Sequence, residues 1–292
     1  MLRRTLVTLA IVAAALVAAP AIAQTGGDNP MSTTSSTGKV PVGGAEIHYE
    51  VHGDGPPLVL LHGGVDPSET FGAPLAAMAK THKVIAIHLR GHGFSTDSDE
   101  PWSTEAMADD VAAVLQQLGI GKARFMGYSL GAGVSLQVAI RHPELVEKLV
   151  AVSVAFRADG AYPEVRQAFA QMPGMAAAIG QQLSASPLAQ LYPDVDWETM
   201  MRKTGEMNQP DRDWTEGIRT LRPTTLLVFA DADFVRPEHV VEFWKLLGGG
   251  QRDAGLGSQR PANQLSIIPN TTHRSLIHSP LLIEVATAFF TQ

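Results

Sequence analysis

The sequence predicts an α/β protein with a mostly parallel central sheet and helices on both faces of that sheet. Short apolar segments of strand length alternate along the chain with longer amphipathic segments of helix length. Alternation of this kind favours a parallel sheet, because a crossover helix has to connect each strand to its parallel neighbour. The 292 residues suffice for one large domain of this class or for two small ones.

Seven segments have the pattern expected of strands. Residues 46–51 alternate between apolar and polar side chains, as a strand with one buried face does. Residues 57–61 and 83–89 are apolar runs that end at glycine-containing loops, and residues 123–126 form a short run before a glycine. The remaining apolar runs are 149–156, 224–230 and 265–268.

Helices are expected between and after these strands. Residues 104–118 are amphipathic, with Ser103 or Thr104 as the N-cap and Gly119 as the end of the helix. The other segments with helical character are 71–80, 132–140, 237–247 and 280–290.

Two stretches interrupt the alternation. Residues 159–221 contain no convincing strand and are rich in methionine, which indicates a helical insertion after a strand of the sheet. Packing against the main domain explains most of its large apolar side chains, but methionine also adapts to irregular apolar ligands. Met172, Met175 and Trp197 are therefore candidates for the lining of a substrate pocket. Residues 248–264 form a glycine-rich polar loop, either a disordered insertion or a mobile edge of the site.

The start of the chain has the three parts of a secretory signal peptide over residues 1–23. Arg3 and Arg4 give a charged start, an apolar run follows, and Ala21-Ile22-Ala23 is a small-residue cleavage site. We expect cleavage after Ala23 and a periplasmic or secreted product, exported by the general or the twin-arginine route. The apolar run is short for a membrane span and no cysteine exists to carry a lipid, so no stable membrane insertion is expected after cleavage.

Composition limits the remaining possibilities. Residues 24–38 are almost entirely small and polar, which predicts a flexible linker before a folded domain over 39–292. A net charge of −7 and a pI near 5.8 argue against a nucleic-acid partner, which requires a basic stripe. The absence of cysteine excludes thiol catalysis and disulfides. The oligomeric state is left open.

The segment Gly127-Tyr128-Ser129-Leu130-Gly131 carries the strongest chemical signal, because it lies between a predicted strand and a predicted helix. A serine at such a turn has a strained backbone that exposes its hydroxyl at the carboxyl edge of the sheet. Glycines two positions to either side are needed, since a Cβ there would collide with the neighbouring strand or helix. The N–H of Leu130 is left free to bind an oxyanion, and a glycine-rich turn with a capping serine is the simpler alternative.

A serine nucleophile needs a base and a carboxylate at the same sheet edge. One predicted strand ends at Asp231 and Asp233, and the last one is followed by His273, so all follow the carboxyl ends of parallel strands. The order Ser, Asp, His is that of one known triad arrangement. The loop His62-Gly63-Gly64 after residues 57–61 can supply a second oxyanion N–H, from Gly64.

These motifs together resemble the α/β-hydrolase fold family, of the serine esterase and lipase kind, over essentially the whole mature chain. The matching segments, in order, are Leu61-His62-Gly63-Gly64, Arg90-Gly91-His92-Gly93-Phe94-Ser95, Gly127-Tyr128-Ser129-Leu130-Gly131, Ala230-Asp231-Ala232-Asp233 and Thr272-His273. The resemblance implies Ser129 as nucleophile, Asp233 as acid and His273 as base, with Gly64 and Leu130 as oxyanion donors. It also places the insertion 159–221 where the family has its lid.

Several residues compete for these roles. His278 lies near His273 but next to a helix start, Asp231 is a rival of Asp233, and Asp159 occupies a place where some members of the family carry their acid. His62 is interpreted as a structural loop histidine. The spacing of His88 and His92 does not amount to a metal site, because Arg90-Gly91 breaks any helix there. No metal and no cofactor is expected, and the dinucleotide pattern G-x-G-x-x-G is absent.

The predicted reaction is hydrolysis of a small-molecule carboxylic ester through an acyl-enzyme. A lactone, including a large macrocycle, is the nearest alternative, and carbon–carbon bond hydrolysis or perhydrolysis uses the same triad. Related epoxide hydrolases and haloalkane dehalogenases have a carboxylate nucleophile at the turn, so Ser129 counts against them. A hydrolase-like binding protein without activity is the alternative from a different class.

Overall fold

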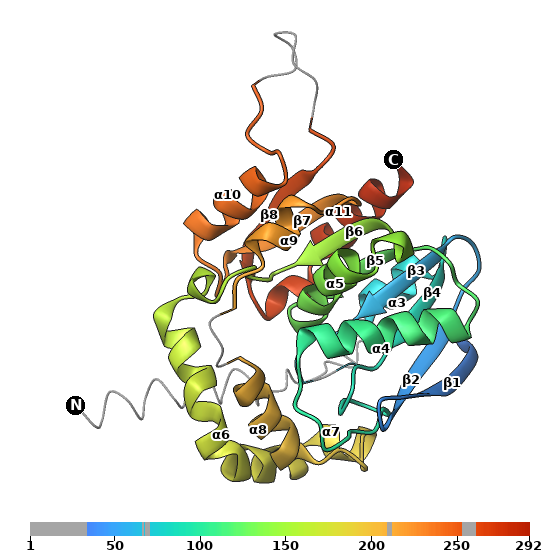
Figure 1. Ribbon diagram of the computed structural model, residues 1–292, viewed down its shortest axis with the longest axis vertical. Coiled ribbons are helices and arrows are strands. Elements are labelled where there is room, and N and C mark those ends of the chain that lie inside the picture. Colours follow the sequence, from blue (N-terminus) through green and yellow to red (C-terminus); the bar gives the residue numbers. More distant parts are fainter. Residues whose placement is uncertain (1–33, 66, 68–70, 209–211, 253–260) are drawn as a thin grey trace.

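The computed structural model describes residues 34–65, 67, 71–208, 212–252 and 261–292. Within this part of the chain, eight strands form one sheet in the order β1-β2-β4-β3-β5-β6-β7-β8 (Figure 1). The strands are β1 (Thr34–Val42), β2 (Ala45–His52), β3 (Pro57–Leu61), β4 (Lys83–Ile87), β5 (Ala123–Tyr128), β6 (Val146–Val152), β7 (Thr224–Ala232) and β8 (Gln264–Thr272).

Parallel pairing dominates the sheet, as the sequence predicts. β3 pairs in parallel with β4 and β5, and β5, β6, β7 and β8 follow one another in parallel. Only the β1–β2 and β2–β4 pairs of the described sheet are antiparallel. The loops that follow the parallel strands therefore gather at one edge, which is where open α/β sheets bind their ligands.

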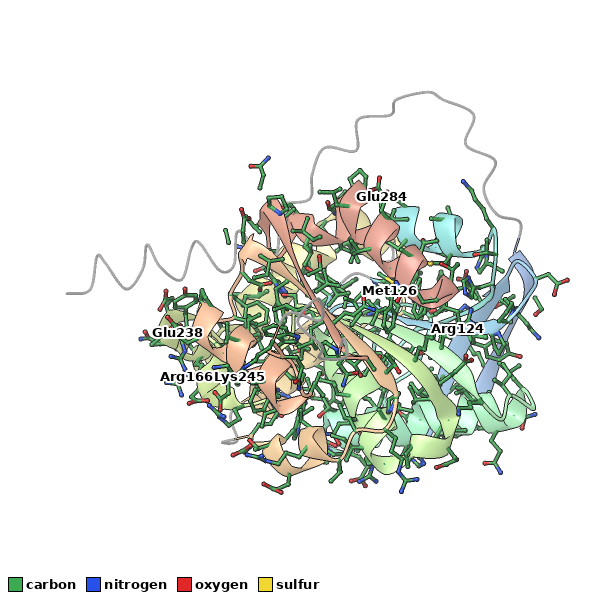
Figure 2. All side chains as sticks on the ribbon, turned by 90° about the horizontal axis from the view of Figure 1, so that it is seen from above. Arg124, Met126, Arg166, Glu238, Lys245 and Glu284 are labelled. Carbon is green, nitrogen blue, oxygen red and sulfur yellow. The ribbon has the colours of Figure 1, made fainter. Side chains whose placement is uncertain are left out.

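Helices cover both faces of the sheet (Figure 1). The core on one face includes α4 (Thr104–Gln117), α5 (Leu130–Arg141) and α10 (Pro237–Leu246), and the core on the other includes α3 (Ala73–Met78) and α11 (Pro280–Thr291). Strand side chains alternate between the two cores, as their period of two requires. Figure 2 labels Met126, buried in the core beneath α11, and Glu284, exposed on the outer side of that helix.

The described part of the insertion between β6 and β7 is helical. Its helices are α6 (Pro163–Ser184), α7 (Pro187–Leu191), α8 (Trp197–Met207) and α9 (Thr215–Arg219). The backbone of Glu198 lies so close to Gly180 that a Cβ on this glycine would collide with it, and α6 therefore packs tightly on α8. The buried Lys203 fastens α8 to the loop after β4, with its Nζ 2.8 Å from the Asp97 carboxylate. A role of this insertion as a lid remains a prediction.

The first strand corrects one expectation from the sequence. β1 begins at Thr34, inside the segment 24–38 that was expected to be a linker, and Gly38 pairs with Tyr49 of β2. Small polar residues give little strand signal of their own, because β-propensity depends on the neighbouring strand. The linker prediction is therefore wrong for residues 34–38, and the folded domain begins before residue 39.

Other predictions for the ends and loops lie outside the described residues. These are the signal peptide over 1–23, the first part of the linker up to residue 33, and residues 253–260 of the glycine-rich loop. Among the helices of the described residues, none is both long enough and apolar enough to cross a membrane.

A buried histidine makes this fold sensitive to acid. His239 of α10 is fully buried, and its Nε2 accepts the backbone N–H of Phe156 at 3.2 Å. Burial, together with the positive charge of Arg157, lowers the pKa of His239 to about 4. A histidine in the unfolded chain has a pKa of about 6.5, so the unfolded chain binds the additional proton between these two values. Stability is consequently lost as the pH falls from about 6.5 towards 4.

We expect His239→Gln to reduce this acid sensitivity. Glutamine keeps an acceptor for the Phe156 N–H but does not titrate, so the loss of unfolding free energy between pH 7 and pH 5 should be smaller by about 1–2 kcal/mol. Urea denaturation of both proteins at the two pH values measures the difference. His278→Gln, at an exposed histidine, is the control. Equal acid sensitivity of wild type and His239→Gln would contradict the prediction.

Candidate active site

The turn between β5 and α5 places Ser129 at the carboxyl edge of the sheet. Its backbone has φ 54° and ψ −111°, the strained geometry that the sequence analysis expects. A Cβ on Gly127 would collide with the carbonyl oxygen of Gly131, and a Cβ on Gly131 with that of Leu61. Only glycine fits at either position, so the turn presents a partly exposed serine hydroxyl in a fixed place.

His273 directly follows β8 and lies between Ser129 and Asp233. Its Nε2 is 3.1 Å from Oγ of Ser129, and its Nδ1 is 3.2 Å from Oδ1 of Asp233. The imidazole stacks on the ring of Tyr128 at a centroid distance of 5.3 Å and meets the ring of Phe234 edge-on at 4.1 Å. The structure thus brings together the three residues that the sequence analysis named as nucleophile, base and acid.

Asp233 is positioned to remain ionised. Its side chain is 2% exposed, and its carboxylate accepts the backbone N–H of Ala230 at 3.0 Å and that of Phe234 at 2.7 Å. Burial opposes the charged form, but the hydrogen bond and charge of His273, with the bonds from Ser153 and Ala230, hold the pKa of Asp233 below its ordinary value. A carboxylate in this state stabilises the imidazolium that forms during acyl transfer.

Ser153 is a buried fourth member of the arrangement. It follows β6 with φ 55°, and its Oγ lies 2.7 Å from both carboxylate oxygens of Asp233 and 2.5 Å from Nδ1 of His273. An ionised carboxylate can only accept, so the hydroxyl donates its single proton to Asp233 and turns a lone pair towards His273. Nδ1 of His273 therefore carries the ring proton, and Nε2 is free to accept the proton of Ser129.

Ser153 belongs to no sequence motif, and it lies inside the apolar run 149–156 that is expected to be a strand, whereas β6 ends at Val152. The feature that matters is its left-handed backbone, which turns the hydroxyl towards the triad, and this conformation is not visible in the sequence. One signal could have identified it: Ser153 follows β6, and β6 lies in the sheet between β5, which precedes Ser129, and β7, which precedes Asp233.

The rival residues lie elsewhere. The exposed Asp231 accepts the backbone N–H groups of Asn270 and Thr271 at 2.8 and 2.9 Å, and so shapes the loop that carries His273. His278 is exposed at the end of a 3₁₀ turn, and Asp159 pairs with Arg157 at 3.0 Å. Within the described residues, none of these three rivals hydrogen-bonds to Ser129 or His273.

Two buried histidines hold the loop that carries Gly64. Nδ1 of His62 is 2.6 Å from the carbonyl oxygen of Gly63, and Nε2 of His92 is 3.0 Å from that of Gly64. The N–H of Gly131 donates to the carbonyl of His62 at 3.0 Å, which ties the start of α5 to this loop. In the described part of the chain, neither the N–H of Gly64 nor that of Leu130 donates to a protein acceptor, so both can serve an oxyanion.

His48, Glu50 and His88 form a cluster whose ligand atoms lie within 4.8 Å of one another, a spacing that a metal ion could use. The hydrogen bonds do not fit a metal. The backbone N–H of Phe94 donates to Nδ1 of His88 at 3.1 Å, so Nε2, which faces Glu50, carries the proton and has no lone pair for a ligand bond. The neighbouring imidazoles of His48 and His88, with Nε2 atoms 3.6 and 3.7 Å from the carboxylate, also hold the pKa of Glu50 below its ordinary value. We assign this cluster a structural role.

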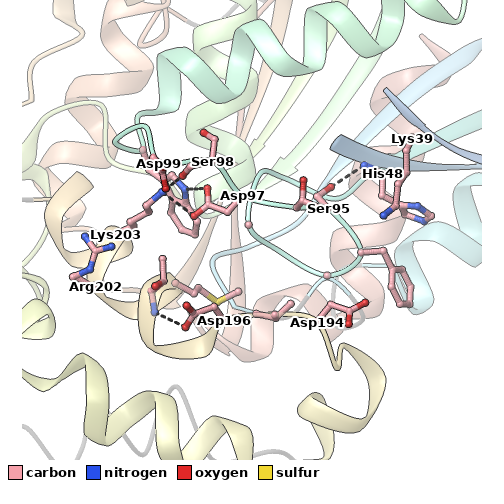
Figure 3. A pocket seen from close by; sticks show the side chains of 18 residues that line it. Lys39, His48, Ser95, Asp97, Ser98, Asp99, Asp194, Asp196, Arg202 and Lys203 are labelled. Atoms are coloured by element: carbon pink, nitrogen blue, oxygen red, sulfur yellow. Dashed lines mark hydrogen bonds and ion pairs between the residues drawn. The ribbon is translucent and has the colours of Figure 1, made fainter. Parts of the chain in front are cut away.

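A pocket of about 750 Å³ lies between the loop after β4 and the start of α8 (Figure 3). Its lining combines the apolar side chains of Phe94 and Met200 with acidic and basic groups such as Asp99 and Arg202. None of the triad residues lines it, and neither do Met172, Met175 and Trp197. Met172 and Trp197 are buried in the apolar core and Met175 packs against that core, so a pocket-lining role for these three side chains remains a prediction.

The geometry defines a class of protein. A mostly parallel sheet covered on both faces, with Ser, Asp and His after β5, β7 and β8, is the α/β-hydrolase arrangement. The model of the family described as alpha/beta hydrolase fold matches residues 56–194. These residues, 139 of the 292, are similar in sequence to that family.

Relatives and solved structures agree with this assignment. A protein of Caulobacter vibrioides provisionally named carbamate hydrolase RutD is 38% identical over 128 residues, which cover 42% of this chain and 46% of that protein. The chain thus matches less than half of this relative's length. The enol-lactonase from Burkholderia xenovorans LB400 superposes with a TM-score of 0.68 at 22% identity, covering 87% of this chain and 100% of that one. A thermophilic esterase from Thermogutta terrifontis gives a TM-score of 0.70 at 19% identity, covering 88% and 98%.

Proposed function

We propose that the protein is a serine hydrolase that cleaves a carboxylic ester through an acyl-enzyme. The observation that carries the proposal is the 3.1 Å contact between Ser129 and His273, with Asp233 behind the ring. The match of residues 56–194 to a hydrolase family model and the fold shared with an esterase and an enol-lactonase support it. No cofactor is needed for this chemistry.

Each residue of the site has a step in the proposed reaction. His273 accepts the proton of Ser129 at Nε2, and Oγ attacks the ester carbonyl to form a tetrahedral intermediate. The N–H groups of Gly64 and Leu130 bind the oxyanion, and the protonated His273 donates its proton to the leaving alcohol. Water, activated by His273, then hydrolyses the acyl-enzyme and regenerates the serine.

Opening of a lactone is a second candidate, favoured by the structural similarity to the enol-lactonase. A lactone is a cyclic ester, so the same atoms react and the alcohol remains attached to the acyl group. Because of the partial match to RutD, carbamates are a third class of substrate to be tested.

Two experiments test the proposal. A fluorophosphonate probe should label Ser129 in the wild type and leave a Ser129→Ala variant unlabelled. A panel of p-nitrophenyl esters of increasing chain length, lactones and carbamates then ranks the bond types by kcat/KM. Absence of labelling together with absence of turnover across the panel would favour the alternative of a binding protein without activity.

We predict that Ser153→Ala lowers kcat/KM for the best ester by about 10-fold. The variant loses a hydrogen bond to an ionised group, a contribution of about 1.5–3 kcal/mol, while the direct contact between His273 and Asp233 remains. Steady-state kinetics with the ester measures the loss. Ser95→Ala is the matched control, since Ser95 is also buried and donates to a carbonyl oxygen at 2.7 Å, but away from the triad. Equal activity losses in the two variants would contradict the assigned role.

A further inference from the structure

Among the described residues, Arg212 has no carboxylate partner. It lies in the segment between α8 and α9, and its Nη2 donates to the carbonyl oxygen of Ala155 at 3.2 Å. Its Nε is buried and has no hydrogen-bond partner among the described residues. Arg90, Arg141 and Arg157 each pair with a carboxylate within hydrogen-bond distance, whereas no described carboxylate forms an ion pair with Arg212.

The groups around Arg212 contact its side chain but do not neutralise its charge. The guanidinium carbon lies 4.5 Å from the centroid of the Trp214 ring, a cation–π contact. Burial lowers the pKa of Arg212, and the negative charge of Glu105 opposes this effect from a distance. The carboxylate of Glu105 accepts the hydroxyl of Thr104 at 3.0 Å instead. A guanidinium whose Nε is buried without a hydrogen-bond partner is unfavourable, so this site is suited to an anion from outside the chain.

Two sets of contacts relate the position of Arg212 to that of the triad. Its carbonyl accepts the N–H of Ala158 at 2.8 Å, and the N–H of Trp214 donates to the carbonyl of Phe156 at 3.0 Å, so residues 212–214 run along the chain after β6. The guanidinium donates to the carbonyl of Ala155, which lies two residues after Ser153. Two residues of extended chain span at most about 7 Å.

The Trp214 ring makes the second set of contacts. Its nearest atom is 3.4 Å from the place that a Cβ on Gly133 would occupy. Gly133 is four residues along α5 from Ser129, about 6 Å of helix. These contacts place Arg212 beside the segments that follow β5 and β6 at the carboxyl edge of the sheet.

We propose that Arg212 binds a carboxylate of the substrate, so that the preferred substrate is an ester or lactone that carries a free carboxylate beyond the reacting carbonyl. This inference rests on the proposed function, because it names the substrate class of the same site. A guanidinium can donate two parallel N–H groups to the two oxygens of a carboxylate, a geometry that an ammonium does not provide.

The test compares two acyl groups of nearly equal size that differ in charge. One is the p-nitrophenyl half-ester of glutarate, which keeps a free carboxylate, and the other is its methyl ester, which is neutral. We expect the wild type to prefer the charged substrate, and Arg212→Gln to lose about 10- to 100-fold in kcat/KM for that substrate but less than about 3-fold for the neutral one. Arg212→Lys should recover part of the loss.

Controls separate this role from a structural one. Arg166→Gln removes the same charge from an exposed position on α6, labelled in Figure 2, and should leave the preference unchanged. If Arg212→Gln lowers both substrates equally, or if the wild type shows no preference for the charged one, the proposal is overturned.

A binding measurement keeps this inference distinct from the proposed hydrolysis. Calorimetric titration with glutarate should detect binding to the wild type and to Ser129→Ala, and binding at least about 10-fold weaker to Arg212→Gln. If no ester is turned over and the fluorophosphonate probe does not label Ser129, the proposed hydrolysis fails, while glutarate binding still decides the role of Arg212. Absent binding, or equal binding to wild type and Arg212→Gln, overturns the inference.

Discussion

Ser129→Ala is expected to lower kcat for ester hydrolysis by about 10⁴–10⁶-fold while the protein stays folded. The hydroxyl makes its 3.1 Å contact with His273 at a partly exposed position, so its removal leaves no cavity in either core. Gly127 and Gly131, whose missing Cβ atoms allow the turn, are unchanged. Initial rates on the best ester, with circular dichroism and thermal unfolding of the same samples, measure both parts of the expectation.

Ser103→Ala is an informative control for that experiment. Ser103 caps α4 by accepting the N–H of Ala106 at 3.0 Å, so its loss should cost about 1 kcal/mol of stability without removing activity. The two variants should therefore differ in effect: Ser129→Ala should lower activity, and Ser103→Ala should lower stability. A Ser129→Ala variant that keeps more than a few per cent of its activity would show that another residue is the nucleophile.

The sequence predicts the parts of this site that follow from local rules. The glycines around Ser129 identify the turn, because both are required by contacts that any side chain would violate. The ends of β7 and β8 place Asp233 and His273 at the same edge, because parallel strands all end there. The order of these segments along the chain is therefore enough to bring the three residues together.

The features that the sequence does not reveal depend on contacts between distant segments. β1 is a strand because β2 supplies its hydrogen bonds, although its small polar residues resemble a linker. Ser153 joins the triad through a left-handed backbone, and Arg212 stands out only because no carboxylate of the described residues forms an ion pair with it. No pattern of residue types encodes a missing partner.

The choice between the two aspartates at the end of β7 shows how the structure decides where the sequence leaves alternatives. Asp231 lies near the end of the strand and Asp233 directly follows the strand, with one residue between them. Asp231 accepts two backbone N–H groups from the end of β8, just before His273, whereas Asp233 reaches the imidazole itself. Asp231 fixes the end of β8 and Asp233 faces the ring, so their substitutions should have very different effects.

Asp233→Asn is expected to lower kcat by about 10⁴-fold. The carboxylate of Asp233 receives four donors: the N–H groups of Ala230 and Phe234, the hydroxyl of Ser153 and the Nδ1–H of His273. The amide of an asparagine has only one oxygen, so its NH₂ group must face at least one of these donors. The imidazole can relieve this conflict by moving its proton to Nε2. In that tautomer Nε2 faces Ser129 with a hydrogen and cannot accept the serine proton.

Two comparisons make the Asp233→Asn result specific. Asp231→Asn, on an exposed carboxylate at the end of β7, should lose less than about 10-fold, since it disturbs the contact with the end of β8 but leaves the charge behind the imidazole in place. Adding Asp233→Asn to Ser129→Ala should lower kcat little further, because residues that act as one unit are lost together. Steady-state kinetics of the single and double variants provides both comparisons. If Asp231→Asn were the inactive variant and Asp233→Asn retained wild-type turnover, the acid of this triad would be Asp231, and the hydrogen bonds around Asp233 would serve the fold alone.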